Sequence, residues 1–61
     1  MKLPLRQRQI IERIASGKAD KEIADELKIS VHTVAVHVRC ILRRFSARNR
    51  SQAAVAWERS K

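Results

Sequence analysis

Apolar side chains recur along this chain at intervals of three and four residues, which is the period of an amphipathic α-helix. The clearest stripe joins Val34, Val38, Ile41, Leu42 and Phe45, with polar side chains on the opposite face of the same segment. Its β-branched valines lower helix propensity, but the length and period of the stripe favour a helix over a strand. The pattern predicts four helices, at about residues 5–16, 20–27, 31–45 and 50–59.

Residues suited to helix ends stand at the borders of these segments. Pro4 suits a first helical turn, and Gly17 fits the left-handed position that follows a last turn. Ser30 and Asn49 are N-cap candidates, and Asp20 can cap the second helix or favour its start through the helix dipole. One glycine and one proline are too few for a turn-rich β fold, so we expect an all-α fold, a compact four-helix bundle.

The length of 61 residues limits the chain to one domain, residues 1–61, with a small core. Such a chain rarely encloses an active site, and its serines, histidines and acids suggest no catalytic combination. We therefore expect no enzyme, no catalytic residue and no cofactor. The longest apolar run, 53–57, has five residues, whereas a membrane-spanning helix needs roughly 20, so no membrane partner is expected.

The net charge of +8 is concentrated towards the end of the chain. Residues 39–61 hold seven basic side chains and one acidic side chain, a net of +6, and five arginines fall within residues 39–50. A guanidinium can bind phosphate oxygens or the edge of guanine through two parallel hydrogen bonds. The charge indicates a polyanionic partner, but charge alone leaves nucleic acid, an acidic membrane surface and an acidic protein open.

Residues 20–45 have the outline of a helix-turn-helix. A short helix is followed by a three-residue connection, 28–30, and then by a longer helix. The outer face of the longer helix carries His32, Ala35, Val36, Arg39 and Arg43. In this motif the second helix enters the major groove of DNA while the first crosses the backbone.

Residues 3–54 resemble the LuxR-type (GerE-like) helix-turn-helix of bacterial transcription regulators. The pattern K-E-I-A-x-x-L-x-I-S-x-x-T-V-x-x-H-V, residues 21–38, is specific as a whole, although each of its short words is weak. The matching residues are Leu3, Arg6, Arg8, Ile10, Ile11, Ile14, Ala15, Gly17, Lys21, Glu22, Ile23, Ala24, Leu27, Ile29, Ser30, Thr33, Val34, His37, Ile41, Leu42, Arg43, Arg44, Arg48, Asn49, Arg50 and Ala53.

The resemblance implies a four-helix domain whose third helix reads base edges through Ala35, Val36 and Arg39. Arg39 can bind guanine N7 and O6, and Val36 can contact a thymine methyl group. Many family members carry lysine where this chain has Ala35, which favours modest specificity or dependence on DNA shape. The residues implied or expected to bind phosphate are Lys21, Ser30, Thr33, Arg43, Arg44, Arg48 and Arg50.

Two further departures from the family pattern concern the scaffold. Gln7 replaces the usual acid, so its usual ion pair is absent or replaced by a hydrogen bond. Ser46 replaces the glycine that usually ends the third helix. A serine in the left-handed conformation there costs on the order of 1 kcal/mol, unless the helix ends differently.

The family pairs through its fourth helix, which implies a homodimer contact at Ser51, Ala54, Val55 and Glu58. The expected function is sequence-specific binding of double-stranded DNA, as the effector domain of a bacterial transcription regulator acting on two half-sites in the cytoplasm, at the nucleoid. RNA polymerase is a further candidate partner. A sensor domain either precedes this module or never existed, and the residues do not separate these cases.

Several side chains allow more than one interpretation. His32, His37 and Cys40 invite a metal site, but a fourth ligand is missing, so no metal is expected. His37 either packs against the core stripe or contacts phosphate, and packing is favoured. Trp57 belongs to the core or to an interface. Two other functions remain as rivals: a basic amphipathic binder of membranes or acidic proteins, and a sigma-factor-like domain that accompanies RNA polymerase.

Overall fold

The computed structural model describes residues 2–60, and its regular elements are four helices. They are α1 (Leu5–Ala15), α2 (Asp20–Leu27), α3 (Val31–Phe45) and α4 (Arg50–Ser60). The predicted all-α fold is confirmed, and each predicted boundary lies within one residue of the observed one. Pro4 directly precedes α1, and its carbonyl accepts the amide hydrogen of Arg8 at 2.9 Å.

Gly17 ends α1 as its position in the sequence predicts. Its φ is +88°, and the amide of Gly17 donates to the carbonyl of Ile14 while the amide of Lys18 donates to that of Arg13. These two bonds form a Schellman motif, which satisfies carbonyls that the last turn leaves free. Nothing lies within 4 Å of a Cβ built at this glycine, so its backbone conformation rather than lack of space favours glycine here.

α2 begins at residue 20 as predicted, but its N-cap is Ala19, so Asp20 does not cap the helix. Ala19 has no side-chain acceptor. Instead Glu22 reaches back, and its Oε1 accepts the amide hydrogen of Ala19 at 2.8 Å. Asp20 and Glu22 place negative charge in the first turn, where the helix dipole favours it.

Serines delimit α3 at both ends. The Oγ of Ser30 accepts the amide hydrogen of Thr33 at 3.0 Å, which confirms the predicted N-cap. Ser46 has a φ of +52°, and the amide of Ala47 donates to the carbonyl of Leu42 at 2.9 Å. The helix therefore ends in the left-handed conformation that a glycine would adopt more easily.

Asn49 caps α4 as predicted, since its Oδ1 accepts the amide hydrogen of Gln52 at 2.9 Å. The side chain of Gln52 reaches back in turn, and its Oε1 accepts the amide hydrogen of Arg48 at 2.8 Å. Two amides at the helix start thus gain side-chain acceptors, and the connection 46–49 is tied to α4.

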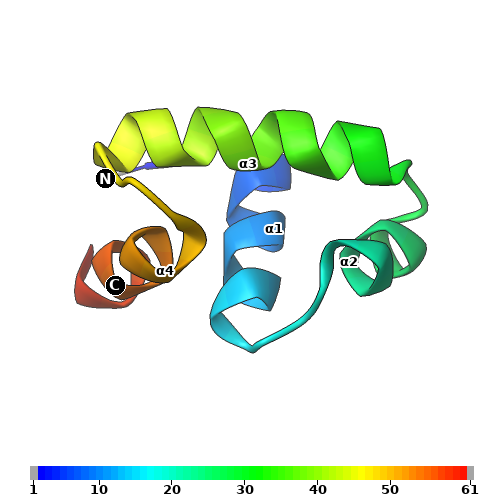
Figure 1. Ribbon diagram of the computed structural model, residues 1–61, viewed down its shortest axis with the longest axis horizontal. Coiled ribbons are helices and arrows are strands. Elements are labelled where there is room, and N and C mark those ends of the chain that lie inside the picture. Colours follow the sequence, from blue (N-terminus) through cyan, green and yellow to red (C-terminus); the bar gives the residue numbers. More distant parts are fainter. Residues whose placement is uncertain (1, 61) are drawn as a thin grey trace.

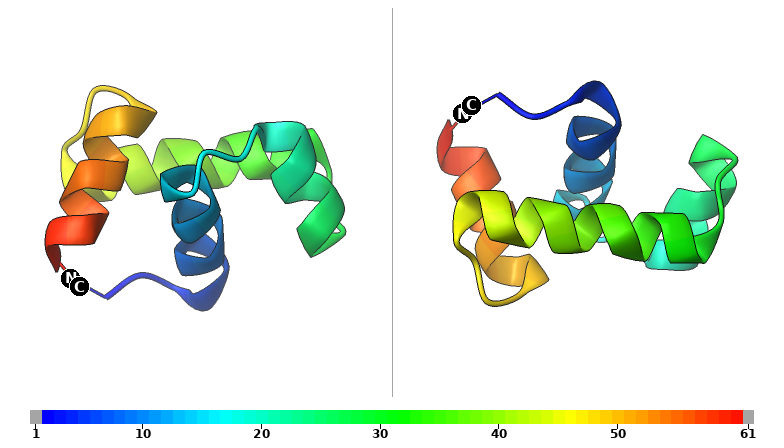
Figure 2. Two further views of the ribbon diagram at one scale, coloured as in Figure 1. Left: turned by 90° about the horizontal axis from the view of Figure 1, so that it is seen from below. Right: turned by 90° about the horizontal axis from the view of Figure 1, so that it is seen from above.

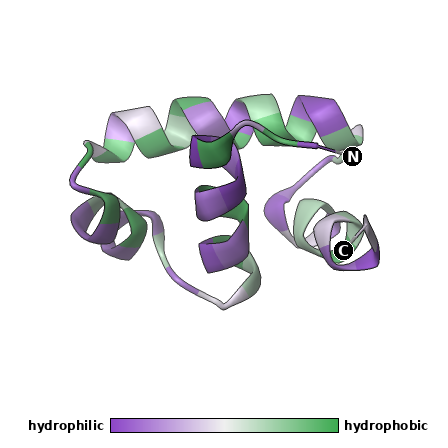
Figure 3. Cartoon of the chain, turned by 180° about the vertical axis from the view of Figure 1, so that it is seen from behind, coloured by the Kyte–Doolittle hydropathy of each residue, from purple (hydrophilic) through white to green (hydrophobic). Residues whose placement is uncertain are grey.

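The core lies where α3 meets the other three helices and α1 meets α4 (Figure 1). α3 runs along one edge of the molecule, α1 stands nearly perpendicular to it, and α2 and α4 lie on either side of α1 (Figures 1 and 2). Figure 3 shows apolar ribbon turned inwards on these helices and polar ribbon turned outwards. The buried apolar residues are Leu3, Ile10, Ile11, Ile23, Ala24, Val34, Val38, Ile41, Ala53 and Trp57.

Two core positions settle alternatives that the sequence left open. Trp57 is 7% exposed, so it belongs to the core. Gln7 is buried against the same cluster, and its Oε1 has no hydrogen-bond donor among residues 2–60. Within the described residues, neither an ion pair nor a hydrogen bond to that oxygen replaces the interaction of the usual acid.

Ion pairs tie the helix ends together. Glu26 of α2 contacts Arg13 of α1 at 2.8 Å and Lys18 of the connection at 2.7 Å. The hydrogen bonds from Lys18 and then from Arg13 lower the pKa of the Glu26 carboxyl. The same bond to Glu26 raises the pKa of Lys18. These contacts join the last turn of α2 to α1 and to the connection between the two helices.

Candidate nucleic-acid interface

The outer face of α3 is open along its length, because the other three helices all lie on its inner side (Figure 2). Val34, Val38 and Ile41 point into the core. The opposite side chains, at spacings of four, three and four, are exposed. They are His32, Val36, Arg39 and Arg43. We call this exposed line the α3 ridge. A protruding helix of this kind fits the width of the DNA major groove.

The three predicted base-reading residues all lie on this open side. Val36 and Arg39 belong to the α3 ridge, and Val36 is 45% exposed. Ala35 is exposed beside the ridge. The structure therefore brings the three side chains to one surface, where only Arg39 offers hydrogen-bond donors.

The helix-turn-helix itself forms as the sequence pattern indicates. α2 packs against α3, with Ile23 and Ala24 buried between the elements. Ile29 of the turn packs against the core. The turn begins at Lys28, which has a φ of +58° and thus ends α2 in the left-handed conformation. This geometry leaves one face of α3 exposed along the helix.

Two predicted phosphate-binding hydroxyls meet at the start of α3. Ser30 Oγ and Thr33 Oγ1 are 2.9 Å apart and share one hydrogen bond. Because each hydroxyl carries a single hydrogen, this pair retains one hydrogen that can be donated to another acceptor. Lys21 is exposed near the start of α2. These groups bring donors and a cation to the helix-turn-helix surface.

The basic side chains predicted at the other end of α3 divide into two groups. Arg43, Arg44 and Arg48 are exposed. Arg50 is only partly exposed. Its guanidinium forms a bidentate ion pair with Asp20, with Nη2 2.6 Å from Oδ2 and Nη1 2.5 Å from Oδ1. This hydrogen bonding raises the pKa of Arg50.

Sequence reasoning missed the ion pair between Asp20 and Arg50. Thirty residues separate the two, so no local spacing signals their contact. The pair joins the first residue of α2 to the first residue of α4. A bidentate pair of this geometry is strong among partly exposed ion pairs. Arg50 therefore has an ion-pair partner, whereas the other predicted phosphate-binding cations have none in the described part of the chain.

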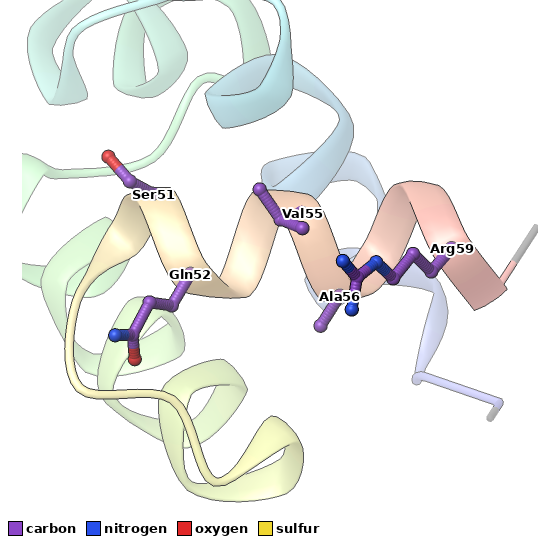
Figure 4. A pocket seen from close by; sticks show the side chains of 5 residues that line it. All are labelled: Ser51, Gln52, Val55, Ala56 and Arg59. Carbon is purple, nitrogen blue, oxygen red and sulfur yellow. The ribbon is translucent and has the colours of Figure 1, made fainter.

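The predicted dimer contact forms one stripe on α4. Ser51, Val55 and Glu58 are exposed, Ala54 is partly buried, and Val55 is 51% exposed. Shallow hollows lie on both sides of Val55: one is lined partly by Ser51 and the other partly by Ala54 and Glu58. Figure 4 shows Ser51 and Val55 projecting from one side of α4.

The residues that suggested a metal site do not gather into one. His32 is exposed, whereas His37 and Cys40 are half-buried on α3. Within residues 2–60, no three histidine, cysteine or acidic side chains lie close enough together to hold a metal ion. The partial burial of His37 agrees with the favoured interpretation that it packs against the core.

Comparison with known proteins identifies the family. Residues 1–57 match the family model described as GerE: bacterial regulatory proteins, luxR family. The chain belongs to this family. It is 43% identical over 53 residues to the transcriptional regulatory protein LiaR of Bacillus subtilis (strain 168), and 40% identical over 53 residues to the spore germination protein GerE of the same strain. Over 50 residues it is 40% identical to a nitrate/nitrite response regulator protein homolog of Haemophilus influenzae.

The relatives differ in how much of their length this chain covers. The matches to LiaR and GerE each span 87% of this chain, but they span 25% of LiaR and 72% of GerE. The match to the Haemophilus protein spans 82% of this chain and 24% of that protein. The chain thus spans about a quarter of the length of most of these relatives. It is a helix-turn-helix domain of a family of DNA-binding transcription regulators. None of the helices within residues 2–60 has the length and apolar character needed to cross a membrane.

Proposed function

We propose that this domain binds double-stranded DNA sequence-specifically by inserting α3 into the major groove, as the effector domain of a bacterial transcription regulator. One observation carries the proposal: the α3 ridge is open and ends in arginines, while the opposite face of the same helix is core. Membership of the LuxR family supports it. The proposed place of action is the bacterial cytoplasm, at the nucleoid, and the task requires no catalytic residue or cofactor.

Base reading is assigned to the middle of α3. Arg39 is exposed and can donate two parallel hydrogen bonds to guanine N7 and O6. Val36, one turn earlier, offers methyl groups to a thymine methyl. Ala35 allows the helix to approach closely but contributes no hydrogen bond.

Phosphate contacts are assigned to the flanks of the ridge. Lys21 and the hydroxyl pair of Ser30 and Thr33 serve one end of the site. The exposed side chains of Arg43, Arg44 and Arg48 serve the other end. Arg50 already donates two of its five N–H groups to Asp20, whose negative charge offsets its own, so we assign it the weakest share of the predicted set. Such contacts position the protein and do not select the sequence.

The proposed assembly is a homodimer on two half-sites, paired through α4. Val55 projects between two hollows, so a second copy related by a two-fold axis can place its own Val55 in the facing hollow. Ser51, Ala54 and Glu58 surround this contact. RNA polymerase is a further proposed partner, because transcription regulators act on that enzyme.

The closed core weighs against the rival amphipathic binder. Such a binder presents one continuous apolar face to a membrane or partner. Here the apolar stripes of α1, α2 and α3 are turned towards one another, and the large exposed apolar side chains among residues 2–60 are scattered. Leu5, Val31, Val36 and Val55 make up that group.

Duplex titrations of two single variants test the proposal. Arg39→Ala is expected to cost roughly 1–3 kcal/mol on a selected duplex and to relax the preference at one base pair. Lys21→Ala is expected to weaken selected and random duplexes equally and to reduce the slope of log K against log salt by about 1. Fluorescence anisotropy at several salt concentrations measures both.

The two variants serve as controls for each other, since each removes one exposed cation from the same surface. Equal loss of selectivity in both would contradict the assignment of base reading to Arg39. Wild-type chain that binds selected and random duplexes with the same affinity would contradict sequence-specific function as a whole.

A further inference from the structure

The α3 ridge consists of His32, Val36, Arg39 and Arg43. His32 is its one member to which neither base binding nor phosphate binding has been assigned. It lies in the first turn of α3, two residues after the N-cap Ser30. Its side chain is exposed, and no hydrogen bond to its imidazole is found within residues 2–60. Both ring nitrogens therefore remain available to an external partner.

The neighbouring hydroxyls are partly used within the domain, and the one hydrogen that they retain is already assigned to phosphate. Ser30 and Thr33 bond to each other, and Ser30 also caps the helix. Ala35 and Val36 have no polar side-chain atoms. Between the N-cap and Arg39, His32 is thus the exposed ridge residue with a hydrogen-bonding side chain.

The position of His32 favours a base edge over phosphate. Residues along the outermost line of a helix in the major groove face the groove floor, whereas the flanks and ends of the helix face the two phosphate backbones. In helix-turn-helix complexes the N-terminal residues of the second helix contact base edges. His32 satisfies both conditions, since it belongs to the α3 ridge and to the first turn of α3.

We propose that His32 is a further specificity-determining residue, whose ring N–H donates a hydrogen bond to the N7 atom of a purine in the major groove. This inference rests on the proposed function, because it requires α3 to occupy that groove. Seven residues separate His32 from Arg39, which is about 10 Å along the helix axis. The two side chains are thus about two turns apart on α3 and reach different base pairs.

Replacement of single N7 atoms tests the contact directly. A duplex selected from a random pool with the wild-type chain is prepared in versions that each carry one 7-deazapurine, which lacks the N7 acceptor. We expect wild-type binding to weaken by about 3- to 10-fold at the purine read by His32. His32→Ala is expected to lose a similar factor on the unmodified duplex and to be insensitive to the 7-deazapurine at that one position.

Two matched variants separate this contact from others. DNA binding by Arg39→Ala is expected to weaken when a 7-deazapurine replaces the purine assigned to His32. It is expected to be unaffected by the same replacement at the guanine assigned to Arg39. Lys21→Ala is expected to keep the sensitivity of the wild type at both positions. Because His32 is exposed, the circular dichroism and melting temperature of His32→Ala should match those of the wild type.

The outcomes distinguish the two proposals. His32→Ala that stays sensitive to every 7-deazapurine, or that weakens selected and random duplexes equally, would overturn the base contact and leave the proposed function intact. The second of these results would identify a phosphate contact. Wild-type chain without preference for the selected duplex would overturn the proposed function, and the inference about His32 with it.

Discussion

At the scale of single residues, the chain adopts the left-handed backbone conformation at two positions that are not glycine. Gly17 adopts a φ of +88° without cost, but Lys28 and Ser46 adopt φ values of +58° and +52°. A side chain at such a position costs roughly 1–2 kcal/mol, because its Cβ crowds the following carbonyl oxygen. The Schellman bonds after α3 hold Ser46 in this conformation.

Replacement of Ser46 by glycine should therefore stabilise the domain. We expect Ser46→Gly to raise the free energy of unfolding by about 1 kcal/mol and the melting temperature by about 4–8 °C. Ser16→Gly is the matched control, because Ser16 also ends a helix but has a φ of −83°. That variant should be less stable than the wild type, since glycine there adds freedom to the unfolded chain and removes the hydrogen bond from Ser16 Oγ to the carbonyl of Glu12. Thermal unfolding followed by circular dichroism measures both, and equal shifts would contradict the argument.

At the scale of elements, ion pairs place α2 relative to its neighbours. Glu26 holds α2 to α1 through Arg13 and Lys18, and Asp20 holds it to α4 through Arg50. The apolar contacts of α2 are made by few residues, since Ile23 and Ala24 are its buried side chains. The orientation of the first helix of the motif thus depends on charges at its two ends as well as on the core.

Acidification should reveal the Glu26 contacts. The folded protein holds the pKa of Glu26 below its ordinary value of 4.5, so its contribution to stability is present above that pH and is lost as the pH falls through the folded pKa. Glu26→Gln should therefore lower the urea midpoint at pH 7, and the difference from the wild type should shrink at pH 3.

The neighbouring acid provides the control for this measurement. Asp25 is exposed on the same helix and forms no ion pair within residues 2–60. Asp25→Asn should change the urea midpoint less than Glu26→Gln at pH 7. If the difference between Glu26→Gln and the wild type were the same at both pH values, the ion pairs would contribute nothing to stability.

At the scale of the whole molecule, two surfaces on different helices divide the proposed tasks. The α3 ridge faces outwards from one edge, and the α4 stripe around Val55 lies apart from it, with the basic connection 46–49 between the two helices (Figure 1). A domain of this size is expected to cover one half-site, so the proposed pairing through α4 would double the length of DNA that is read. Each surface can then be altered without the other.

Substitution at Val55 should separate pairing from DNA binding. We expect Val55→Glu to leave the affinity for a duplex with one half-site unchanged, because the α3 ridge is intact. On a duplex with two half-sites, the apparent affinity should fall by about 5-fold or more as the coupling between copies is lost. Analytical ultracentrifugation should show two wild-type chains per two-site duplex.

Leu5→Glu is the control for this change, because Leu5 is also a large exposed apolar side chain but lies on α1. It should bind both duplexes as the wild type does. A wild-type complex with one chain per two-site duplex would contradict the paired assembly.

The sequence by itself determined the elements and the exposed face of α3. Apolar spacing predicted the four helices, and local capping chemistry at Gly17, Ser30 and Asn49 placed their ends, because these signals act over three or four residues. The same periodicity separated the buried side of α3 from its exposed side, so Val36 and Arg39 could be assigned to the surface before any packing was known.

Only the tertiary structure decided which charges are already engaged. The pair of Asp20 and Arg50 joins residues 30 positions apart, and the pair of Glu26 and Arg13 joins residues 13 positions apart. It also placed Trp57 in the core and left Val55 outside, although both belong to one short apolar run. Such contacts depend on how whole helices pack. Because the free energy of packing is shared among many residues that are distant in sequence, no local sequence pattern predicts these contacts.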